Sequence, residues 1–299
     1  MKKLLLVAIW VCCGALSVAC AAEEIVVAAY NLENFVDAPP REPGQRATTR
    51  PKSEKEAAAV VQVVKDIQPD ILGVCEMGSP ERFEDFKKRL ADAGLSFTDF
   101  EYVQAADSER HLALVSRFPI VARDSQSDVP FELEGRPEKL RRGILDVTVQ
   151  VSAGYRLRLV GVHLKSKLPI PEGEAIVRRL EAQLVRKHLE AILQSDPHTP
   201  LLCYGDFNDT KNEPMFQEIS GLRGTATHLT DLVAHDELGD RWTQYWKAAD
   251  LYSRIDYFFA SPALLPAIVP GKTRVYRSPY WNEASDHRPI FTTLQVPGN

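Results

Sequence analysis

Cysteine is scarce in this sequence: there are five in 299 residues, and only Cys75 and Cys203 lie beyond the first twenty positions. So few cysteines exclude a disulfide scaffold, and the absence of any Cys-x-x-Cys pair excludes a zinc ribbon. Both Cys75 and Cys203 lie in apolar runs. We therefore expect two buried free thiols in preference to a disulfide.

An excess of positive charge is also missing. The sequence has 36 Lys and Arg against 41 Asp and Glu, a formal net charge of −5. This balance excludes a generally basic nucleic-acid coat, but not an enzyme that holds phosphates through local cations and a metal. Hydrophobic residues make up 44% and charged residues 26%, which is a globular composition and excludes a disordered or fibrous chain.

Several well-known signatures are absent as well. Gly271-Lys272-Thr273 resembles the end of a phosphate-binding loop, but Pro266 occupies the position at which that loop needs a glycine. There is no G-x-S-x-G elbow and no H-E-x-x-H helix. No period of 20–50 residues repeats, which excludes solenoids and propellers.

The N-terminus has the pattern of an export signal. Lys2 and Lys3 precede an apolar run that ends in small residues, and we predict a signal peptide over residues 1–22. Residues 23–299 then form one domain, because no linker or composition shift divides them. Cys20 leaves open a lipoprotein cleavage site, and an uncleaved anchor is the remaining alternative. The mature protein is therefore expected in the periplasm or outside the cell.

Apolar runs and helical patterns predict a mixed α/β fold, with a loop over residues 36–52. Ser53 and Glu56 form a capping box, which marks the start of the first helix. The predicted helices cover residues 53–68, 81–93 and 172–194. The predicted strands cover residues 25–30, 71–76, 111–118, 143–151, 156–163, 200–208, 254–261 and 289–296. Strands outnumber helices, which favours two packed sheets with helices outside them.

Polar residues stand at the ends of these apolar strands. The set is Asn31, Glu76, His163, Asp206, Asn208, Asp256, Asp286 and His287. A carboxylate beside a buried strand is costly unless it binds a metal or a partner, so the set predicts one shared site at the sheet edge. Extended backbone would point Asp206 and Asn208 to the same side. Carboxylate and amide oxygens suit a hard cation, Mg²⁺ first, with Mn²⁺ and Ca²⁺ as alternatives.

The motifs NLENF, CE, HLKSK, GDFN, RIDY and SDHRP, in this order, resemble the endonuclease/exonuclease/phosphatase superfamily, whose fold is that of deoxyribonuclease I. The resemblance extends over residues 25–296. It implies an exported bacterial member with a four-layered α/β sandwich of two mixed sheets flanked by helices. It also implies divalent-metal-dependent hydrolysis of phosphate esters.

The same resemblance implies a role for each motif residue. Glu76 would be the main metal ligand, supported by Asn31 and Asp286. Asp206 would orient or deprotonate the attacking water, and Asn208 would hold that water or a phosphate oxygen. His287, polarised by Asp256, would donate to the phosphoryl group, and His163 would stabilise charge on its oxygens.

Three further cations are candidates for substrate contact. Arg117 and Arg142 resemble phosphate-contacting arginines of the family, and Lys165 follows His163 directly. By contrast, Arg178, Arg186 and neighbouring charges on the helix at 172–194 are interpreted as a solvated face, balanced by acidic residues including Glu181.

Three functions fit these residues. The first is an exported nuclease, with nucleic acid as the phosphate-ester substrate. The second keeps the chemistry but acts on a phospholipid or a small phosphate ester, as sphingomyelinases do. The third is a binding protein that has kept the fold and lost activity. No obligate protein partner is evident in the sequence.

The export signal gives the first testable prediction. Protein recovered after export should begin near residue 22, because the apolar run is marginal for a membrane span and is followed by small residues. Intact mass and N-terminal sequencing measure this directly. A diacylated Cys20 would establish the lipoprotein alternative, and a mass that still includes Met1 would contradict cleavage.

Overall fold

Two six-stranded mixed sheets form the centre of the molecule. The computed structural model describes residues 22–37 and 50–298, so all but the last residue of the predicted signal peptide and most of the loop predicted at 36–52 lie outside the described residues. The first sheet, called the β1 sheet, has the order β15 (Arg274–Val275), β16 (Ile290–Val296), β1 (Glu23–Phe35), β2 (Ile71–Met77), β4 (His111–Ser116) and β3 (Asp99–Val103). The second, called the β10 sheet, has the order β11 (Thr230–Asp231), β14 (Asp256–Ala260), β10 (Leu201–Asp206), β9 (Tyr155–His163), β8 (Leu145–Ser152) and β5 (Ile120–Arg123).

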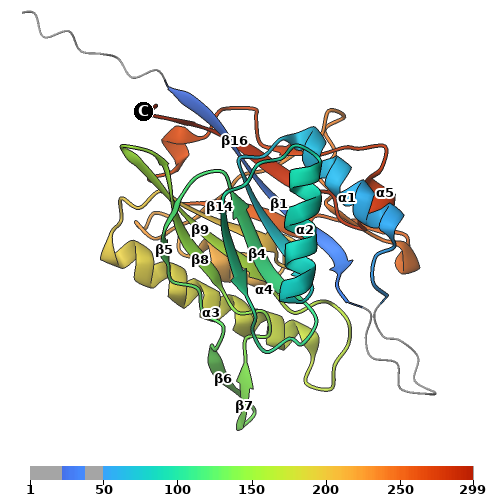
Figure 1. Cartoon of the computed structure of the whole chain (residues 1–299). Helices are drawn as coiled ribbons and strands as arrows, with labels where there is room; N and C mark the ends of the chain where they lie inside the picture. Colours follow the sequence, from blue (N-terminus) through green and yellow to red (C-terminus); the bar gives the residue numbers. More distant parts are fainter. Residues whose placement is uncertain (1–21, 38–49, 299) are drawn as a thin grey trace, which may run out of the picture.

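Helices cover the outer faces of both sheets (Figure 1). Helices α1 (Glu54–Ile67) and α2 (Pro80–Asp92) pack on the β1 sheet, and α3 (Glu174–Ser195) and α4 (Pro214–Ser220) pack on the β10 sheet. The capping box predicted at α1 is present, because Ser53 accepts from the backbone of Glu56 and Glu56 accepts from the backbone of Ser53. No helix among the described residues is long and apolar enough to span a membrane.

Three apolar cores separate the four layers. One lies between the sheets and includes Leu159 and Leu294; the others lie between each sheet and its helices. This arrangement confirms the four-layered α/β sandwich predicted from the sequence. Cys75 and Cys203 are buried free thiols, as expected.

The prediction from the sequence missed the short elements. These are the edge strands β3, β5, β11 and β15, the hairpins β6 (Pro130–Leu133) with β7 (Arg136–Lys139) and β12 (Gln244–Trp246) with β13 (Leu251–Ser253), and the helices α4 and α5 (Trp281–Ala284). Most are half-exposed or exposed and too short for a periodic pattern to develop.

The interpretation of the α3 charges as a solvated face was wrong for three of them. Arg178, Glu181 and Arg186 are all buried. Arg178 pairs with Asp209 in the loop after β10, and the Glu181 carboxylate accepts from the backbone N–H of Lys165. These charges were misassigned because helical charge patterning does not reveal which polar loops will pack against the helix.

The strand register brings the predicted site residues together. In the β10 sheet, Asp206 at the end of β10 pairs with His163 of β9 on one side and with Asp256 of β14 on the other. Three chemically active side chains thus stand in one row across three adjacent strands. In the β1 sheet, Asn31 of β1 pairs with Cys75, one residue before Glu76.

A buried ion pair ties α3 to the β10 sheet and predicts how stability depends on pH. Asp146 is fully buried and accepts from Arg158 at 2.6 and 2.8 Å and from His188 at 2.6 Å. Burial raises the pKa of Asp146, but the hydrogen bonds from His188 and Arg158 outweigh it and lower the pKa. The stabilisation is therefore complete above the unfolded-state pKa of about 3.9 and is lost as the pH falls through the folded-state value.

We expect Asp146→Asn to lower the free energy of unfolding by about 3 kcal/mol at pH 7, because it leaves a buried arginine with a weakened partner. The difference from the unsubstituted protein should shrink as the pH falls from about 4 through the lowered folded-state pKa of Asp146, where the carboxylate loses its charge. Denaturant unfolding at pH 7 and pH 3 measures both. The half-exposed Asp124, which contacts the same Arg158, provides the control: Asp124→Asn should cost under about 1 kcal/mol. Equal losses for the two variants would contradict the account.

Candidate active site

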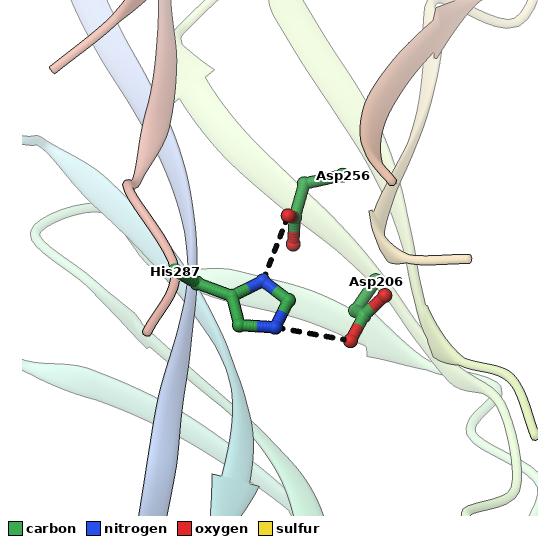
Figure 2. Close-up of side chains that lie close together, drawn as sticks. All are labelled: Asp206, Asp256 and His287. Atoms are coloured by element: carbon green, nitrogen blue, oxygen red, sulfur yellow. Dashed lines mark hydrogen bonds and ion pairs between the residues drawn. The ribbon is translucent and has the colours of Figure 1, made fainter. Parts of the chain in front are cut away.

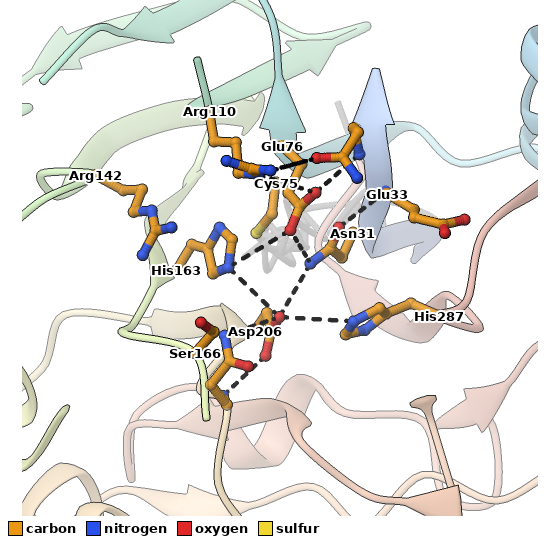
Figure 3. Close-up of polar contacts among 12 residues, drawn as sticks. Asn31, Glu33, Cys75, Glu76, Arg110, Arg142, His163, Ser166, Asp206 and His287 are labelled. Carbon is orange, nitrogen blue, oxygen red and sulfur yellow. Dashed lines mark hydrogen bonds and ion pairs between the residues drawn. The ribbon is translucent and has the colours of Figure 1, made fainter. Parts of the chain in front are cut away.

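The carboxylate of Asp206 is the centre of the polar cluster, and Figure 3 shows side chains from both sheets converging on it. Its Oδ2 accepts from Asn31 Nδ2 at 3.0 Å and from Asn208 Nδ2 at 3.2 Å, and its Oδ1 accepts from the Asn208 backbone at 2.8 Å. The same Oδ2 lies 3.6 Å from His163 Nε2 and 3.7 Å from His287 Nε2. One buried oxygen thus faces two imidazoles and two amides.

Gly205 provides the backbone conformation that places Asp206 at this point. Its φ is +137°, and a Cβ placed there would lie 1.9 Å from the backbone oxygen of Val162. Only glycine fits that close approach between β10 and β9. The extended backbone predicted for Asp206 and Asn208 was wrong, because Asn208 has φ +54°. The two side chains nevertheless meet as predicted, since Asn208 Nδ2 donates to Asp206 and to the backbone oxygen of Leu164.

The β1 sheet contributes Asn31 and Glu76. Asn31 Nδ2 donates to Asp206 and, at 3.4 Å, to Glu76 Oε1, so its amide joins the two carboxylates. Glu76 has φ +61°, which is uncommon for a residue with a side chain. At this point the strand alternation is broken, since Val74 and Met77 both face the helix-side core. The irregularity turns the Glu76 carboxylate toward the site, and strained backbone of this kind is typical of functional positions.

His287 and Asp256 form a close pair. His287 Nδ1 lies 2.8 Å from Asp256 Oδ2, and both side chains are buried (Figure 2). Two buried hydroxyls hold the pair in place: Ser285 Oγ accepts from the His287 backbone, and Thr243 Oγ1 accepts from the Asp256 backbone. Ser285 also donates to the Asn31 backbone oxygen, which fixes the histidine to the end of β1.

The two histidines lie in opposite electrostatic surroundings. Burial lowers the pKa of His287, but three neighbouring carboxylates outweigh burial and raise the pKa well above its ordinary value. They are Asp256, Asp286 and Asp206. Burial lowers the pKa of His163, and the charge of Arg142 lowers it further. These opposite shifts favour the protonated form of His287 and the neutral form of His163, a division that suits one proton donor and one neutral hydrogen-bonding group.

Negative charge is in excess around this centre. Burial raises the pKa values of the Glu33, Asp206 and Asp286 carboxyls, and a neighbouring carboxylate raises each of them further. Glu76 is one of these neighbours, acting on both Glu33 and Asp286. Carboxylates that disfavour one another's charge in a buried site fit a divalent cation, which would neutralise them.

The most compact ligand group differs from the predicted one. Ligand atoms of Asp206, Asp256 and His287 lie within 4.8 Å of one another, whereas the sequence predicts Glu76, Asn31 and Asp286. The 2.8 Å contact between His287 and Asp256 uses the imidazole as a hydrogen-bond partner and favours a proton there over a metal. The donor set around Glu76, all of it oxygen or amide, is the better match to a hard cation.

Comparison with known proteins agrees with this geometry. A model of the endonuclease/exonuclease/phosphatase family matches residues 28–287. The chain belongs to this family. Members of the family hydrolyse phosphate esters, and divalent metals are their general cofactor. No curated protein matches the sequence.

Solved structures with this fold include the human Nocturnin catalytic domain with bound sulfate, which is 17% identical with a TM-score of 0.64 and covers 92% of this chain and 98% of its own. A family protein from Bacteroides thetaiotaomicron is 17% identical, with a TM-score of 0.59 and coverage of 92% and 99%. Truncated TDP2 from Caenorhabditis elegans is 17% identical, with a TM-score of 0.58 and coverage of 91% and 98%. At these identities the likeness shows the fold.

Two of the three predicted substrate cations are not placed to meet substrate. Arg117 follows β4 and pairs with Asp70 at the start of β2, the opposite end of the β1 sheet from Glu76. Lys165 is buried, and its ammonium donates to the backbone oxygens of Ser166 and Leu168. Sequence proximity to a motif could not reveal either partner. Arg142, the third, lies at the site beside His163 (Figure 3).

Sequence reasoning also missed residues that contact the cluster. Arg110 lies 3.6 Å from Glu76 and donates to Asn34 at 2.7 Å, and Gln244 donates to Asp286 at 3.3 Å. Arg110 directly precedes strand β4, so the rule of polar residues at strand ends would have found it. Gln244 lies in a short hairpin that no pattern predicts.

The Asp256–His287 pair gives a prediction for this family member. His287→Ala should lower kcat by about 10²–10⁴, and adding Asp256→Asn to it should cost little more, because residues that act as a unit are not additive. His163→Ala should cause a separate loss of similar size. The measurement is kcat of the three single variants and the double variant on a generic phosphodiester.

His188→Ala is the control, since His188 is a partly buried histidine whose partner Asp146 lies outside the site. It should lower the melting temperature and leave kcat within about twofold. Additive losses in the Asp256/His287 double variant would contradict the pairing.

Proposed function

We propose that this protein is an exported, divalent-metal-dependent phosphodiesterase, and that its substrate is nucleic acid. The observation that carries the proposal is the convergence of Asp206, His287 and His163 on one point, beside an excess of carboxylates. Hydrolysis of a phosphate diester needs these parts: a group that takes a proton from water, and donors aimed at developing negative charge.

In the proposed mechanism, Asp206 orients the attacking water and accepts its proton. Burial raises the pKa of its carboxyl, which makes it a stronger base than an ordinary aspartate. Asn208 and Asn31 hold the carboxylate through their amides. Both amides donate to Oδ2, and the backbone N–H of Asn208 donates to Oδ1, so the base is oriented before substrate arrives.

His287 is charged and donates to the phosphoryl group, while Asp256 fixes its ring orientation through Nδ1. His163 is neutral and donates a hydrogen bond to a non-bridging oxygen from the other side of Asp206. A cation held by Glu76, with Asn31 and Asp286 in support, would act as a Lewis acid on the phosphoryl oxygens.

Nucleic acid is favoured as substrate by the cations on one side of the site. Arg110 and Arg142 lie near Glu76 and His163, where a phosphate chain would pass (Figure 3). The sulfate bound to the Nocturnin catalytic domain, a phosphate analogue on the same fold, is consistent with an anion-binding site.

A lipid or small-ester substrate is the second candidate, because of the β12–β13 hairpin. Trp246, Leu251 and Tyr252 are about half exposed, at 46%, 50% and 51%. The hairpin borders the site, since the backbone of Tyr245 donates to that of Asp286. Exposed apolar residues next to an active site suit an apolar substrate. The third function, that of a binding protein without activity, is disfavoured because each predicted catalytic position carries its expected residue and these residues meet.

The metal requirement gives the prediction that tests this function. Purified protein should hydrolyse bis-p-nitrophenyl phosphate with Mg²⁺ or Mn²⁺ and lose that activity in EDTA. Glu76→Gln keeps the shape and removes the charge, so it should lower kcat by about 10²-fold and raise the metal concentration for half-maximal rate by about tenfold or more. Glu190→Gln, at a half-exposed glutamate of α3, should change neither.

A panel of DNA, RNA, sphingomyelin and inositol phosphates then separates the candidates. The proposal expects turnover of DNA or RNA at least tenfold above that of the lipid. Preference for sphingomyelin would replace nuclease by lipid hydrolase. Undiminished turnover in exhaustive chelator would contradict the metal-dependent mechanism itself.

A further inference from the structure

The two oxygens of the Glu76 carboxylate have unequal surroundings. Oε2 accepts from the backbone N–H of Asn34 at 2.8 Å and lies 3.6 Å from Arg110 Nε. Oε1 faces the centre of the site, where its contacts are long: 3.4 Å from Asn31 Nδ2 and 3.9 Å from His163 Nε2 (Figure 3). One oxygen is therefore held by partners behind the site, and the other is directed into it.

Arg110 reaches Glu76 mainly through Asn34. Its Nε and Nη2 both donate to the side-chain oxygen of Asn34, at 3.0 and 2.7 Å, while its backbone N–H donates to Asp107 Oδ1 at 3.0 Å. A planar guanidinium with two nitrogens on one acceptor has a fixed orientation, which a flexible ammonium does not. We call the three residues Arg110, Asn34 and Glu76 the Glu76 clamp.

The backbone of β1 is distorted where it enters the clamp. Glu33 and Asn34 both have left-handed backbone, with φ +47° and +59°, and the pairing of β1 with β2 shifts register at this point. Such backbone is costly for residues with side chains and persists where the surroundings hold it. Here it lets Asn34 offer its N–H to Glu76 and its side-chain oxygen to Arg110. The distortion therefore serves the position of the Glu76 carboxylate.

We infer that the clamp selects the cation: by occupying Oε2, Arg110 and Asn34 make Glu76 a ligand through one oxygen, which favours Mg²⁺ over Ca²⁺. Mg²⁺ demands near-octahedral coordination and keeps several waters, whereas Ca²⁺ takes about six to eight oxygens and accepts a carboxylate through both of its oxygens. The clamp withholds that second oxygen. Arg110 and Asn34 are thus positioning residues for the metal ligand. The inference rests on the metal requirement of the proposed function and assigns its specificity for the cation.

The test measures binding of each cation without substrate. Calorimetric titration of chelator-treated protein gives the dissociation constants of Ca²⁺ and Mg²⁺, and their ratio, Ca²⁺ over Mg²⁺, is the readout. Arg110→Lys keeps the charge and loses the paired donors. Asn34→Gly tolerates the left-handed backbone and loses the acceptor. Each should lower the ratio by about tenfold or more, the range for groups that orient metal ligands. The double variant should lower it little further, because both changes break one contact.

Arg82→Lys is the matched control. Arg82 is also half-buried beside the end of β1, where its Nε donates to the backbone oxygen of Val36 at 3.3 Å, but it pairs with Asp37 and Asp85 instead of Glu76. This variant should keep the native ratio within about twofold. A general loss of stability weakens the binding of both cations alike, so the ratio separates the clamp from a merely structural role. Melting temperatures in EDTA check that every variant is folded.

Three results would overturn the inference. Folded Arg110→Lys and Asn34→Gly variants that keep the native ratio would remove the selection between cations. A raised KM for an oligonucleotide with unchanged affinity for both cations would assign Arg110 to substrate instead. Additive falls of the ratio in the double variant would show that Arg110 and Asn34 act separately. Native protein that binds neither cation would refute the metal-dependent function, and the inference with it, a result distinct from an unchanged ratio.

Discussion

The burial of one carboxylate, Asp206, is the constraint on which the site depends. It lies where the ends of the two sheets meet, with an exposed fraction of 1%. A buried carboxylate must be hydrogen-bonded or paired, and here the partners come from both sheets: Asn31 from β1 and Asn208 after β10. The junction of the two sheets is therefore also the chemical centre.

That constraint explains the difference between the two histidines. His287 lies among carboxylates, which raise its pKa, whereas burial and the charge of Arg142 lower the pKa of His163 on the other side of Asp206. The distances from Asp206 Oδ2 to the two Nε2 atoms, 3.7 and 3.6 Å, are almost equal. The two rings differ because of the other groups around them: Asp256 and further carboxylates beside His287, and Arg142 beside His163. Their distances from Asp206 are not the cause, because these are almost equal.

Much of this arrangement was predictable from the sequence, and the reason is physical. Residues such as Glu76, Asp206 and Asp256 end or begin long apolar strands, and strand ends of a sandwich meet at its edge. The arrangement of two packed sheets with helices outside them was predicted from the same strands. The sequence could not show which side chains are already hydrogen-bonded or ion-paired within the protein and so do not contact substrate. Lys165 turns to backbone oxygens of its own loop, Arg117 lies at the wrong end of β4, and Glu181 on α3 is buried under loops that carry no periodic pattern.

The buried carboxylates of this protein fall into two groups, one that stabilises the fold and one that forms the candidate active site. Asp146 and Asp209 are buried beside arginines, and their contacts with His188 and Arg178 hold α3 on the β10 sheet. Asp206, Asp286 and Glu33 are crowded together, with their pKa values raised. Crowded charge of this kind opposes folding, and is retained where chemistry requires it.

Paired measurements on Asp206→Asn and Asp209→Asn test this central claim most directly, because the two carboxylates are both buried and only three residues apart. Melting temperature in EDTA and kcat on a phosphodiester with Mg²⁺ are measured for each. We predict that Asp206→Asn loses at least about 10³-fold in kcat with little loss of melting temperature, while Asp209→Asn, which weakens the Arg178 pair, loses melting temperature and keeps most of its activity. If Asp206→Asn kept its activity, or if it unfolded while Asp209→Asn did not, the central role of Asp206 would be contradicted.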